Sequence, residues 1–312
     1  MQVNSQSKIN QVSSSRPKYS KYRKKLIPFY FLLPLITVLV AFIFIPMVYS
    51  LYLSFHNFNL ARLDRGIRFV GVSNYERFLF GGDFVNSLTI TLIFTVGAVA
   101  IEMLLGFIIA LIFCREFWFR RVIRTLILTP MMIAGVVVGV MWQIILHDQF
   151  GVFNAIVGIF GIPMQAWLTD PNLVLPSLIL TDVWQFTPFV ILILLSGMQS
   201  LPAELYEAAS VDGASYFQKV KAITIPLLKP LLIIVATMRI MDAFRLMDRV
   251  LILTGGGPGT RTMLLNMLAF RETFMAFNLG YGAAISWIIL LLLVTIGIIL
   301  FMLSDLENTF VS

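Results

Sequence analysis

Ionisable side chains occur inside long apolar stretches of this chain, where every charge is costly. One stretch contains a group of them: Arg239, Asp242, Arg245, Asp248 and Arg249. A charged side chain near the centre of a lipid bilayer costs about 2.5–3.5 kcal/mol on insertion scales. We therefore expect these side chains to face a watery cavity or one another rather than lipid.

Helix geometry predicts where these charges point. At about 100° per residue, the charges other than Asp248 fall within an arc of about 120°, and Asp248 lies roughly 60° beyond it. One interpretation is structural pairing of Arg239 with Asp242. Arg245 would then pair with Asp248 or Asp242. The other interpretation is hydrogen bonding to the hydroxyl or carboxylate groups of a substrate. In this stretch the arginines outnumber the aspartates, so the sequence is compatible with an anionic substrate.

Two further apolar stretches carry polar groups in their interiors. The residues are Glu102, Asp182, Trp184 and Gln185, and they are further candidates for contact with a substrate. Buried ionisable residues in a membrane are functional candidates by default. Trp184 and Phe244 offer aromatic faces on which the apolar face of a ligand ring can stack. Trp142 and Trp167 are instead expected at the outer membrane interface.

Histidine and cysteine are too scarce for the usual enzyme chemistry. The sequence holds 2 histidines, His56 and His147, which are far apart, and 1 cysteine, Cys114. A single cysteine excludes an internal disulfide bond and a cysteine-based metal cluster. We therefore expect no catalytic residue and no metal site, and we expect Cys114 to lie at the end of a span.

The composition is that of a polytopic membrane protein. Hydrophobic residues make up 59% of the chain and charged residues 12%, and the mean hydropathy is +0.90. A soluble domain carries about 25% charged residues. Apolar stretches of about 20 residues occur at Pro28–Leu53, Leu88–Phe113, Leu126–Leu146, Leu173–Leu195, Leu228–Leu253 and Tyr281–Leu303. The expected fold is all-α, with six transmembrane helices in a domain over residues 26–312.

Positive charges are distributed unevenly along the chain. The net charge is +7, and residues 1–25 hold seven Lys and Arg but no acidic residue. A basic tail before a membrane span is more simply a cytoplasmic anchor than a nucleic-acid site, so nucleic acid is not an expected partner. With this tail inside, fourteen Lys and Arg fall on the cytoplasmic side and six outside. The positive-inside rule places both termini and residues 200–229 in the cytoplasm.

Residues 200–229 form a polar, helix-forming loop between two apolar stretches. A helix is expected to begin after Pro202, because the run rich in alanine and glutamate that follows favours a helix. Gly213 suits the left-handed position that ends such a helix. A second short helix is expected over Ala214–Ala222, with Pro226 and Pro230 leading into the fifth span.

The same loop carries a specific spacing of residue types. An E-A-A triplet begins at Glu207, a glycine follows at Gly213, and an I-x-I-P sequence occupies Ile223–Pro226. This spacing resembles the EAA loop of ABC importer permeases, E-A-A-x3-G-x9-I-x-L-P, with Ile225 in place of the usual leucine. In that family the loop docks into a groove of the ATP-hydrolysing subunit. The resemblance implies that the coupling contact is made by Glu207, Ala208, Ala209, Asp212 and Gly213.

Three more segments resemble the carbohydrate branch of this family. Phe69–Tyr75 is similar to its F-V-G-x-x-N-Y segment, Gly151–Asn154 to its G-x-x-N segment, and Leu253–Pro258 to its T-x-G-G-P segment. The best match is to the larger chain of trehalose/maltose permeases, in which the stretch that corresponds to Arg239–Asp248 lines the translocation path. The first outer loop, residues 54–87, is too short for the inserted domain of the enteric form.

This resemblance implies a membrane subunit of a binding-protein-dependent oligosaccharide importer in the cytoplasmic membrane of a bacterium or archaeon. The expected partners are a second permease that forms a heterodimer with this chain, two ATP-binding subunits at the cytoplasmic face, and an extracytoplasmic solute-binding protein. The expected substrate is an oligosaccharide, either neutral or of the acidic uronate type.

The sequence does not contain the loop that holds ATP in partner subunits of this kind. A Walker A loop needs G-x-x-x-x-G-K-[ST] to hold phosphate, whereas the glycine-rich run Gly255–Thr260 is followed by Arg261. We therefore expect no cofactor in this chain, with ATP and Mg bound by the partners. The alternative is a secondary, ion-coupled transporter with Glu102 or Asp182 as a proton relay, which has no use for the loop spacing.

Overall fold

The computed structural model describes residues 31–114 and 118–303, so the basic tail predicted at residues 1–25 lies outside the described residues. The chain divides into two compact units, Met1–Tyr52 and Leu53–Ser312. The described part of the first unit belongs to one apolar helix, which comprises residues from Phe31 through the π-helical segment η1 (Val40–Phe44) and α2 (Ile45–Ser54). Its large apolar side chains from Phe31 to Tyr49 are exposed, as expected for a helix that faces lipid or another chain.

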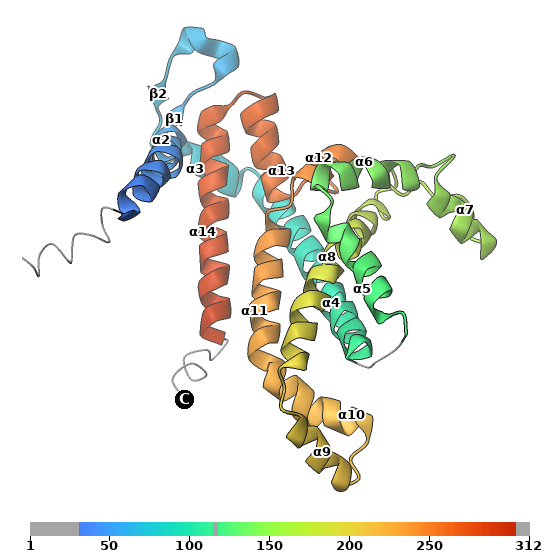
Figure 1. Ribbon diagram of the computed structural model, residues 1–312. Coiled ribbons are helices and arrows are strands. Elements are labelled where there is room, and N and C mark those ends of the chain that lie inside the picture. Colours follow the sequence, from blue (N-terminus) through green and yellow to red (C-terminus); the bar gives the residue numbers. More distant parts are fainter. Residues whose placement is uncertain (1–30, 115–117, 304–312) are drawn as a thin grey trace, which may run out of the picture. The chain divides into compact units, whose positions relative to one another are not determined.

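Long helices form the core of the second unit (Figure 1). They are α4 (Asp83–Phe113), α8 (Val174–Gln199), α11 (Ile225–Phe244) and α14 (Leu279–Leu303). α4 packs against both α8 and α11, and α11 also packs against α14. In the described part of the whole chain, 5 helices are long and apolar enough to cross a membrane, or 6 if a bent pair counts as one span. The predicted all-α membrane fold is therefore confirmed.

Small residues allow α4 and α8 to approach closely. Gly106 on α4 lies against Val190 on α8, and a Cβ atom at Gly106 would overlap the valine side chain. Ala110, one turn further along α4, is fully buried. This stripe of α4 therefore permits the tight helix contact on which the rest of the bundle is built.

The third expected span is not one straight helix. Its parts are α5 (Arg120–Leu128), the 3-10 turn η3 (Thr129–Met132) and α6 (Gly135–Ile145). A bend of 103° separates α6 from the helix before it. Pro130 has no N–H group to continue the helix, and Ala134 is extended. The predicted span Leu126–Leu146 is therefore two helices joined at a bend, and α6 crosses the end of the bundle instead of running along it (Figure 1).

The fifth expected span is also broken. α11 ends at Phe244, and α12 (Asp248–Leu253) follows as a separate short helix that packs along α6. Gly135 and Gly139 on α6 make this contact possible, since a Cβ atom at Gly139 would press on Ile252. The predicted single span Leu228–Leu253 is therefore wrong. The single arc predicted for the charges is wrong as well, because two of them belong to α12.

The loop between α8 and α11 folds as two joined helices. α9 (Ala203–Val211) ends in a Schellman motif, in which the N–H of Ala214 donates to Ala209 O and Gly213 has a φ of +75°. The predicted left-handed role of Gly213 is confirmed. α10 (Tyr216–Lys219) starts with a capping box between Ser215 and Gln218.

The second helix of the loop does not stop before the membrane span. α10 continues through the π-helical segment η4 (Val220–Thr224) into α11, so that one helix covers residues 216–244. The predicted separate helix over Ala214–Ala222 is wrong, because the chain stays helical through the π-helical turn η4 that directly precedes Pro226.

Short elements gather toward the end of the bundle opposite to α9 and α10 (Figure 1). They are β1 (His56–Asn57), η2 (Leu60–Arg65), β2 (Arg68–Phe69), α3 (Ser73–Phe80), α7 (Val152–Ile159), α13 (Leu265–Phe270) and the π-helical η5 (Arg271–Met275). β1 and β2 pair antiparallel, with His56 opposite Phe69. Asn74 holds α3 in place because its side-chain amide donates to Ser54 O and His56 O, each at 2.9 Å.

Candidate functional site

Two carboxylates and two arginines from different helices meet inside the second unit. The residues are Glu102 on α4, Asp182 on α8, Arg239 on α11 and Arg249 on α12. Each side chain is at most 4% exposed. The helix packing therefore brings together four of the residues that the sequence singled out, from three separate apolar stretches.

Arg239 is the centre of this cluster. Its Nε donates to Glu102 Oε2 at 2.7 Å, and its Nη2 donates to Glu102 Oε1 at 3.1 Å and to Asp182 Oδ2 at 3.0 Å. Such two-bond arginine–carboxylate pairs are among the stronger hydrogen-bonded contacts in proteins. The predicted partner Asp242 is only a third neighbour, since its Oδ2 lies 3.8 Å from Nη1.

Asp182 is shared between two arginines, because its Oδ1 contacts Arg249 Nη2. The ring of Phe186, one helical turn after Asp182, lies 4.0 Å from the Arg239 guanidinium carbon and 5.2 Å from that of Arg249. Cation–π contacts are most favourable where water is excluded. The sequence reasoning did not identify Phe186, although its i,i+4 spacing from Asp182 is the signal that would have found it.

A cavity of about 330 Å³ opens beside this cluster. The ionisable residues that line it are Asp182, Arg239, Asp242, Arg245, Asp248 and Arg249. Their formal charges cancel. Asp182 from α8 offsets the positive excess counted along α11 and α12, and Glu102 adds one more negative charge behind Arg239. The excess positive charge of the sequence stretch is therefore not a property of the cavity.

Several buried polar atoms at this cavity have no hydrogen-bond partner among the described residues. They are Nη1 of Arg239, Nε and Nη1 of Arg249, and Oε1 of Gln185. The other end of the Gln185 amide is fixed, since Nε2 donates to Ile133 O at 2.8 Å. Buried polar groups in folded proteins nearly always have a partner, so these atoms are the ones that a bound polar ligand or water would satisfy.

The remaining charges lie at the mouth of the cavity. Arg245 Nη2 donates to Asp242 Oδ1 at 3.0 Å, so the structure forms one of the two pairs predicted for Arg245. Both side chains are about half exposed, at 59% and 49%. Asp248 is half-buried, with its carboxylate against the backbone of Gly135.

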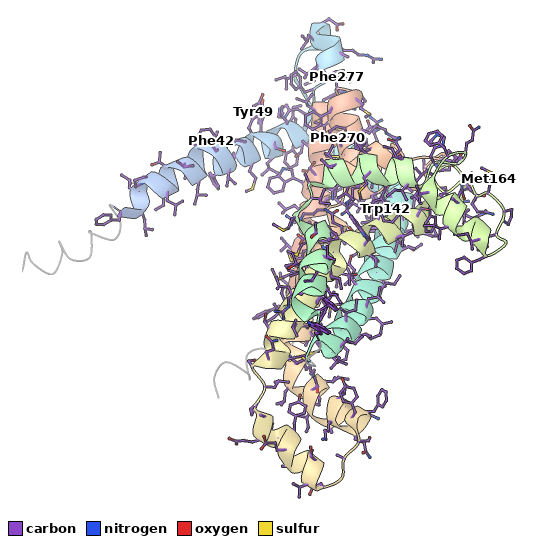
Figure 2. All side chains as sticks on the ribbon, turned by 45° about the vertical axis from the view of Figure 1, so that its right-hand side comes forward. Phe42, Tyr49, Trp142, Met164, Phe270 and Phe277 are labelled. Carbon is purple, nitrogen blue, oxygen red and sulfur yellow. The ribbon has the colours of Figure 1, made fainter. Side chains whose placement is uncertain are left out.

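The predicted aromatic platforms are not at the cavity. Phe244 is fully buried in the core, and Trp184 packs edge-on against Trp142 at 5.8 Å between ring centroids. The prediction that Trp142 lies at the membrane interface is wrong, because the bend before α6 turns it into the core, below α6 in Figure 2. Trp167 is half-buried and donates to Asn154 Oδ1 at 2.8 Å.

The residues predicted to couple to an ATPase lie on the surface of α9 and its C-terminal turn. Glu207, Ala208, Asp212 and Gly213 are exposed, whereas Ala209 is half-buried. Large apolar side chains are also exposed nearby, with Val211 at 89% and Phe217 at 82%. The pair of helices is held together by the hydroxyl groups of Tyr206 and Thr224, which are 2.9 Å apart.

Comparison with known protein families decides the class of this molecule. The family model for binding-protein-dependent transport system inner membrane components matches residues 102–308. The chain belongs to this family. The matched residues contain the buried charge cluster and both helices of the loop, and the resemblance to ABC importer permeases is confirmed.

The permease has relatives whose names state a cargo. The trehalose/maltose transport system permease protein MalF of Thermococcus litoralis is 36% identical over 279 residues, which cover 89% of the permease and 94% of the relative. The trehalose transport system permease protein SugA of Mycobacterium tuberculosis is 31% identical over 270 residues, 86% of each chain. The permease is therefore similar over nearly its whole length to both proteins.

Solved structures share its fold. A chain of a bacterial ABC transporter involved in the import of the acidic polysaccharide alginate matches with a TM-score of 0.79 at 19% identity, covering 92% of the permease and 98% of that chain. A bacterial alginate ABC transporter in complex with an alginate pentasaccharide-bound periplasmic protein matches with a TM-score of 0.78 at 19% identity, covering 91% and 95%. At this identity the likeness concerns the fold alone.

Proposed function

We propose that the permease carries a neutral oligosaccharide across the membrane as one subunit of a binding-protein-dependent ABC importer. The observation that carries this proposal is the cavity between α8, α11 and α12, whose walls combine unpartnered buried donors with no net formal charge. A ligand rich in hydroxyl groups gives those donors acceptors without bringing an uncompensated charge into the protein. The names of the trehalose and maltose relatives support the same class of substrate.

An acidic saccharide fits this cavity less well. Every arginine that lines the cavity has a carboxylate within ion-pair distance. A uronate group would therefore compete with carboxylates already in place, and it would meet the negative charges of Asp242 and Asp248 at close range. Like charges at such separations repel one another, so the cavity favours a neutral ring.

Coupling is proposed to run from α9 through α11 to the buried cluster. The helix over residues 216–244 begins in the loop and contains Arg239. A displacement of the loop would therefore move Arg239 relative to Glu102 and Asp182 on the neighbouring helices. In the proposed cycle, two ATP-binding subunits close around ATP and Mg and push on the exposed face at Glu207–Gly213, and α11 transmits that push.

The other parts of the proposed importer follow from the same class. A second permease completes the pathway with this chain as a heterodimer, and an extracytoplasmic solute-binding protein delivers the sugar. The proposed location is the cytoplasmic membrane of a bacterium or archaeon, with both termini and the loop of α9 and α10 inside. The loop of α9 and α10 lies at one end of the bundle, and α6 and α7 lie toward the other end, which fits such an orientation (Figure 1).

A proton-coupled transporter finds less support in the geometry. Glu102 and Asp182, the carboxylates that a relay would use, both hold arginines in place. Each proton transfer would have to break a buried ion pair, which is costly when one partner is left uncompensated.

Co-purification and the energy source of transport test the proposal together. The permease, produced with its partner subunits, is expected to retain an ATP-binding subunit through purification in mild detergent. Proteoliposomes of that complex with the solute-binding protein outside should take up labelled trehalose or maltose only with ATP inside. Uptake that continues without ATP and stops when a proton gradient is dissipated would instead support ion coupling.

A further inference from the structure

A second cavity lies at the other end of the helix pair that borders the charged cavity. α6 and α12 contribute Gly135, Asp248 and Arg249 to the charged cavity, and the opposite ends of the same helices contribute Gln143 and Ile252 to a cavity of about 490 Å³. At 1.5 Å per helical residue the two ends of α6 are about 16 Å apart. The second cavity is therefore separate from the charged cavity, and the helices α6 and α12 that line it lie toward the end of the bundle opposite to α9 and α10 (Figure 1).

A histidine in the wall of this cavity has one ring nitrogen with a known hydrogen-bond partner. His147 Nδ1 accepts a hydrogen bond from the backbone N–H of Gln149 at 3.2 Å, and its ring stacks on Phe150 with centroids 3.4 Å apart. An imidazole that accepts through Nδ1 carries its proton on Nε2 in the neutral form. His147 therefore presents a fixed ring with one N–H donor left for another partner.

The neighbouring carboxylate is held by its backbone and has room for a ligand. Asp148 O accepts from Asn154 Nδ2 at 2.9 Å, which fixes this turn. In the part of the chain that the structure describes, the Asp148 side chain makes only a long contact, 3.4 Å, from Thr169 Oγ1 to Oδ2. No lysine or arginine is among the residues that line this cavity. The carboxylate is thus a hydrogen-bond acceptor that a hydroxyl group can reach without displacing a cation.

The rest of the wall has the mixed character of a carbohydrate site. Gln143 and Thr254 add polar groups, and the apolar surface comes from Leu146, Leu168, Ile252, Leu253 and Pro258. A sugar ring has hydroxyl groups at its rim and an apolar C–H face, so it can use both kinds of surface at once. The volume is also within the range of about 300–1,000 Å³ found for small-molecule sites.

We propose that this cavity is a second saccharide-binding site, which holds a neutral sugar before it passes along α6 and α12 to the charged cavity. Asp148 accepts from sugar hydroxyl groups, and His147 Nε2 donates to them. Among the described residues that line the cavity, Asp148 carries the only carboxylate and no lysine or arginine balances it, so the site discriminates against uronates. This inference rests on the proposed function as a saccharide importer and on the orientation given above.

Protection of an engineered cysteine from a membrane-impermeant thiol reagent tests this site. In a Cys114→Ser background, Thr169→Cys places the reporter in the cavity wall, and Asp170→Cys is the matched reporter one residue outside it. The assembled complex is reconstituted without the solute-binding protein, so that docking cannot shield the reporter. Maltose and trehalose at saturating concentration are expected to slow modification at position 169 but not at position 170.

Binding-site variants then show whether Asp148 is responsible. Asp148→Asn should raise the maltose concentration needed for half-maximal protection by about tenfold, because a hydrogen bond to a charged group is lost. The control Asp170→Asn removes a nearby carboxylate outside the wall and should leave protection unchanged. Protection that is absent, or that is the same with Asp148→Asn, would overturn the second site.

The same vesicles separate this inference from the proposed function. With the solute-binding protein added, ATP-dependent uptake of maltose or trehalose reports the proposed function directly. Uptake without protection at position 169 rejects the second site and leaves the importer intact. Failure of both uptake and protection with every neutral saccharide rejects the substrate class on which the site depends.

Discussion

Arg239 on α11 donates two hydrogen bonds to Glu102 on α4, at 2.7 and 3.1 Å, and both side chains are at most 1% exposed. The pair joins the helix that begins in the loop of α9 and α10 to α4, which also packs against α8. The pair therefore stabilises the contact between α4 and α11. A movement of α11 would also displace Arg239, which lines the charged cavity.

Loss of one partner of this pair should destabilise the permease strongly. Glu102→Gln leaves the Arg239 guanidinium without its main carboxylate, and breaking a buried pair in this way costs about 3–5 kcal/mol. The measurement is thermal unfolding of the detergent-purified complex. Asp242→Asn is the matched control, since it breaks the exposed pair with Arg245 and should cost at most about 1 kcal/mol.

The double variant Glu102→Leu with Arg239→Leu sharpens this prediction. It removes both charges and leaves Asp182 with Arg249, so it should recover much of the stability lost in Glu102→Gln. A double variant as unstable as the single one would show that side-chain volume, rather than the charge pair, holds α4 and α11 together.

Close packing of α4 on α8 makes Gly106 sensitive to a single methyl group. Gly106→Ala would press its Cβ atom into Val190 and should cost about 1–3 kcal/mol of stability. Gly297→Ala, on α14 where no atom lies near the added Cβ, is the control and should be neutral. Combining Gly106→Ala with Val190→Ala should restore part of the loss, and no rescue would argue against this contact.

The exposed face of α9 should govern attachment of the ATP-binding subunit. Glu207→Lys reverses a charge at the proposed contact and should reduce the amount of ATPase recovered with the permease, while membrane insertion stays normal. Glu204→Lys makes the same reversal nearly one turn earlier on the same exposed helix and should have little effect. Equal ATPase recovery with both variants and with wild type would remove Glu207 from the contact.

Phe186 should matter through its ring face. Phe186→Leu retains an apolar side chain but removes the π face beside Arg239 and Arg249. The lost cation–π interaction free energy is about 1–2 kcal/mol, and we expect the rate of transport to fall about five- to thirtyfold. Phe186→Tyr keeps the ring face and should transport better than Phe186→Leu. The readout is ATP-dependent uptake at matched protein stability, and equal uptake by the two variants would exclude the cation–π role.

Sequence reasoning identified the charged residues and the Arg245–Asp242 pair, but not the main partners of Arg239 and Arg249. The prediction that the charges share one arc assumed a single helix over residues 239–249. It was wrong because α11 ends at Phe244. Residues 245–247 contain neither proline nor glycine, so the sequence gives no local signal for the end of α11. Pairing of Arg239 with Glu102 also required knowledge of which helices are neighbours, and the pattern within one segment does not contain that information.

Local conformation was easier to predict than the direction of helices. Gly213 was expected to be left-handed because a helix with an alanine- and glutamate-rich run ends there, and its φ is +75°. Trp142 was expected at the outer membrane interface, where tryptophan is enriched. The bend between η3 and α6 turns that residue into the core, and α6 packs against α12 beyond the bend.

The central claim is that a cavity without net charge selects a neutral oligosaccharide, and the most direct test is ATP hydrolysis by the reconstituted importer with a panel of saccharides. The complex with its solute-binding protein should hydrolyse ATP faster with a neutral saccharide such as trehalose or maltose, and an oligouronate of the same length should give no stimulation. Stimulation by the oligouronate alone would contradict the account.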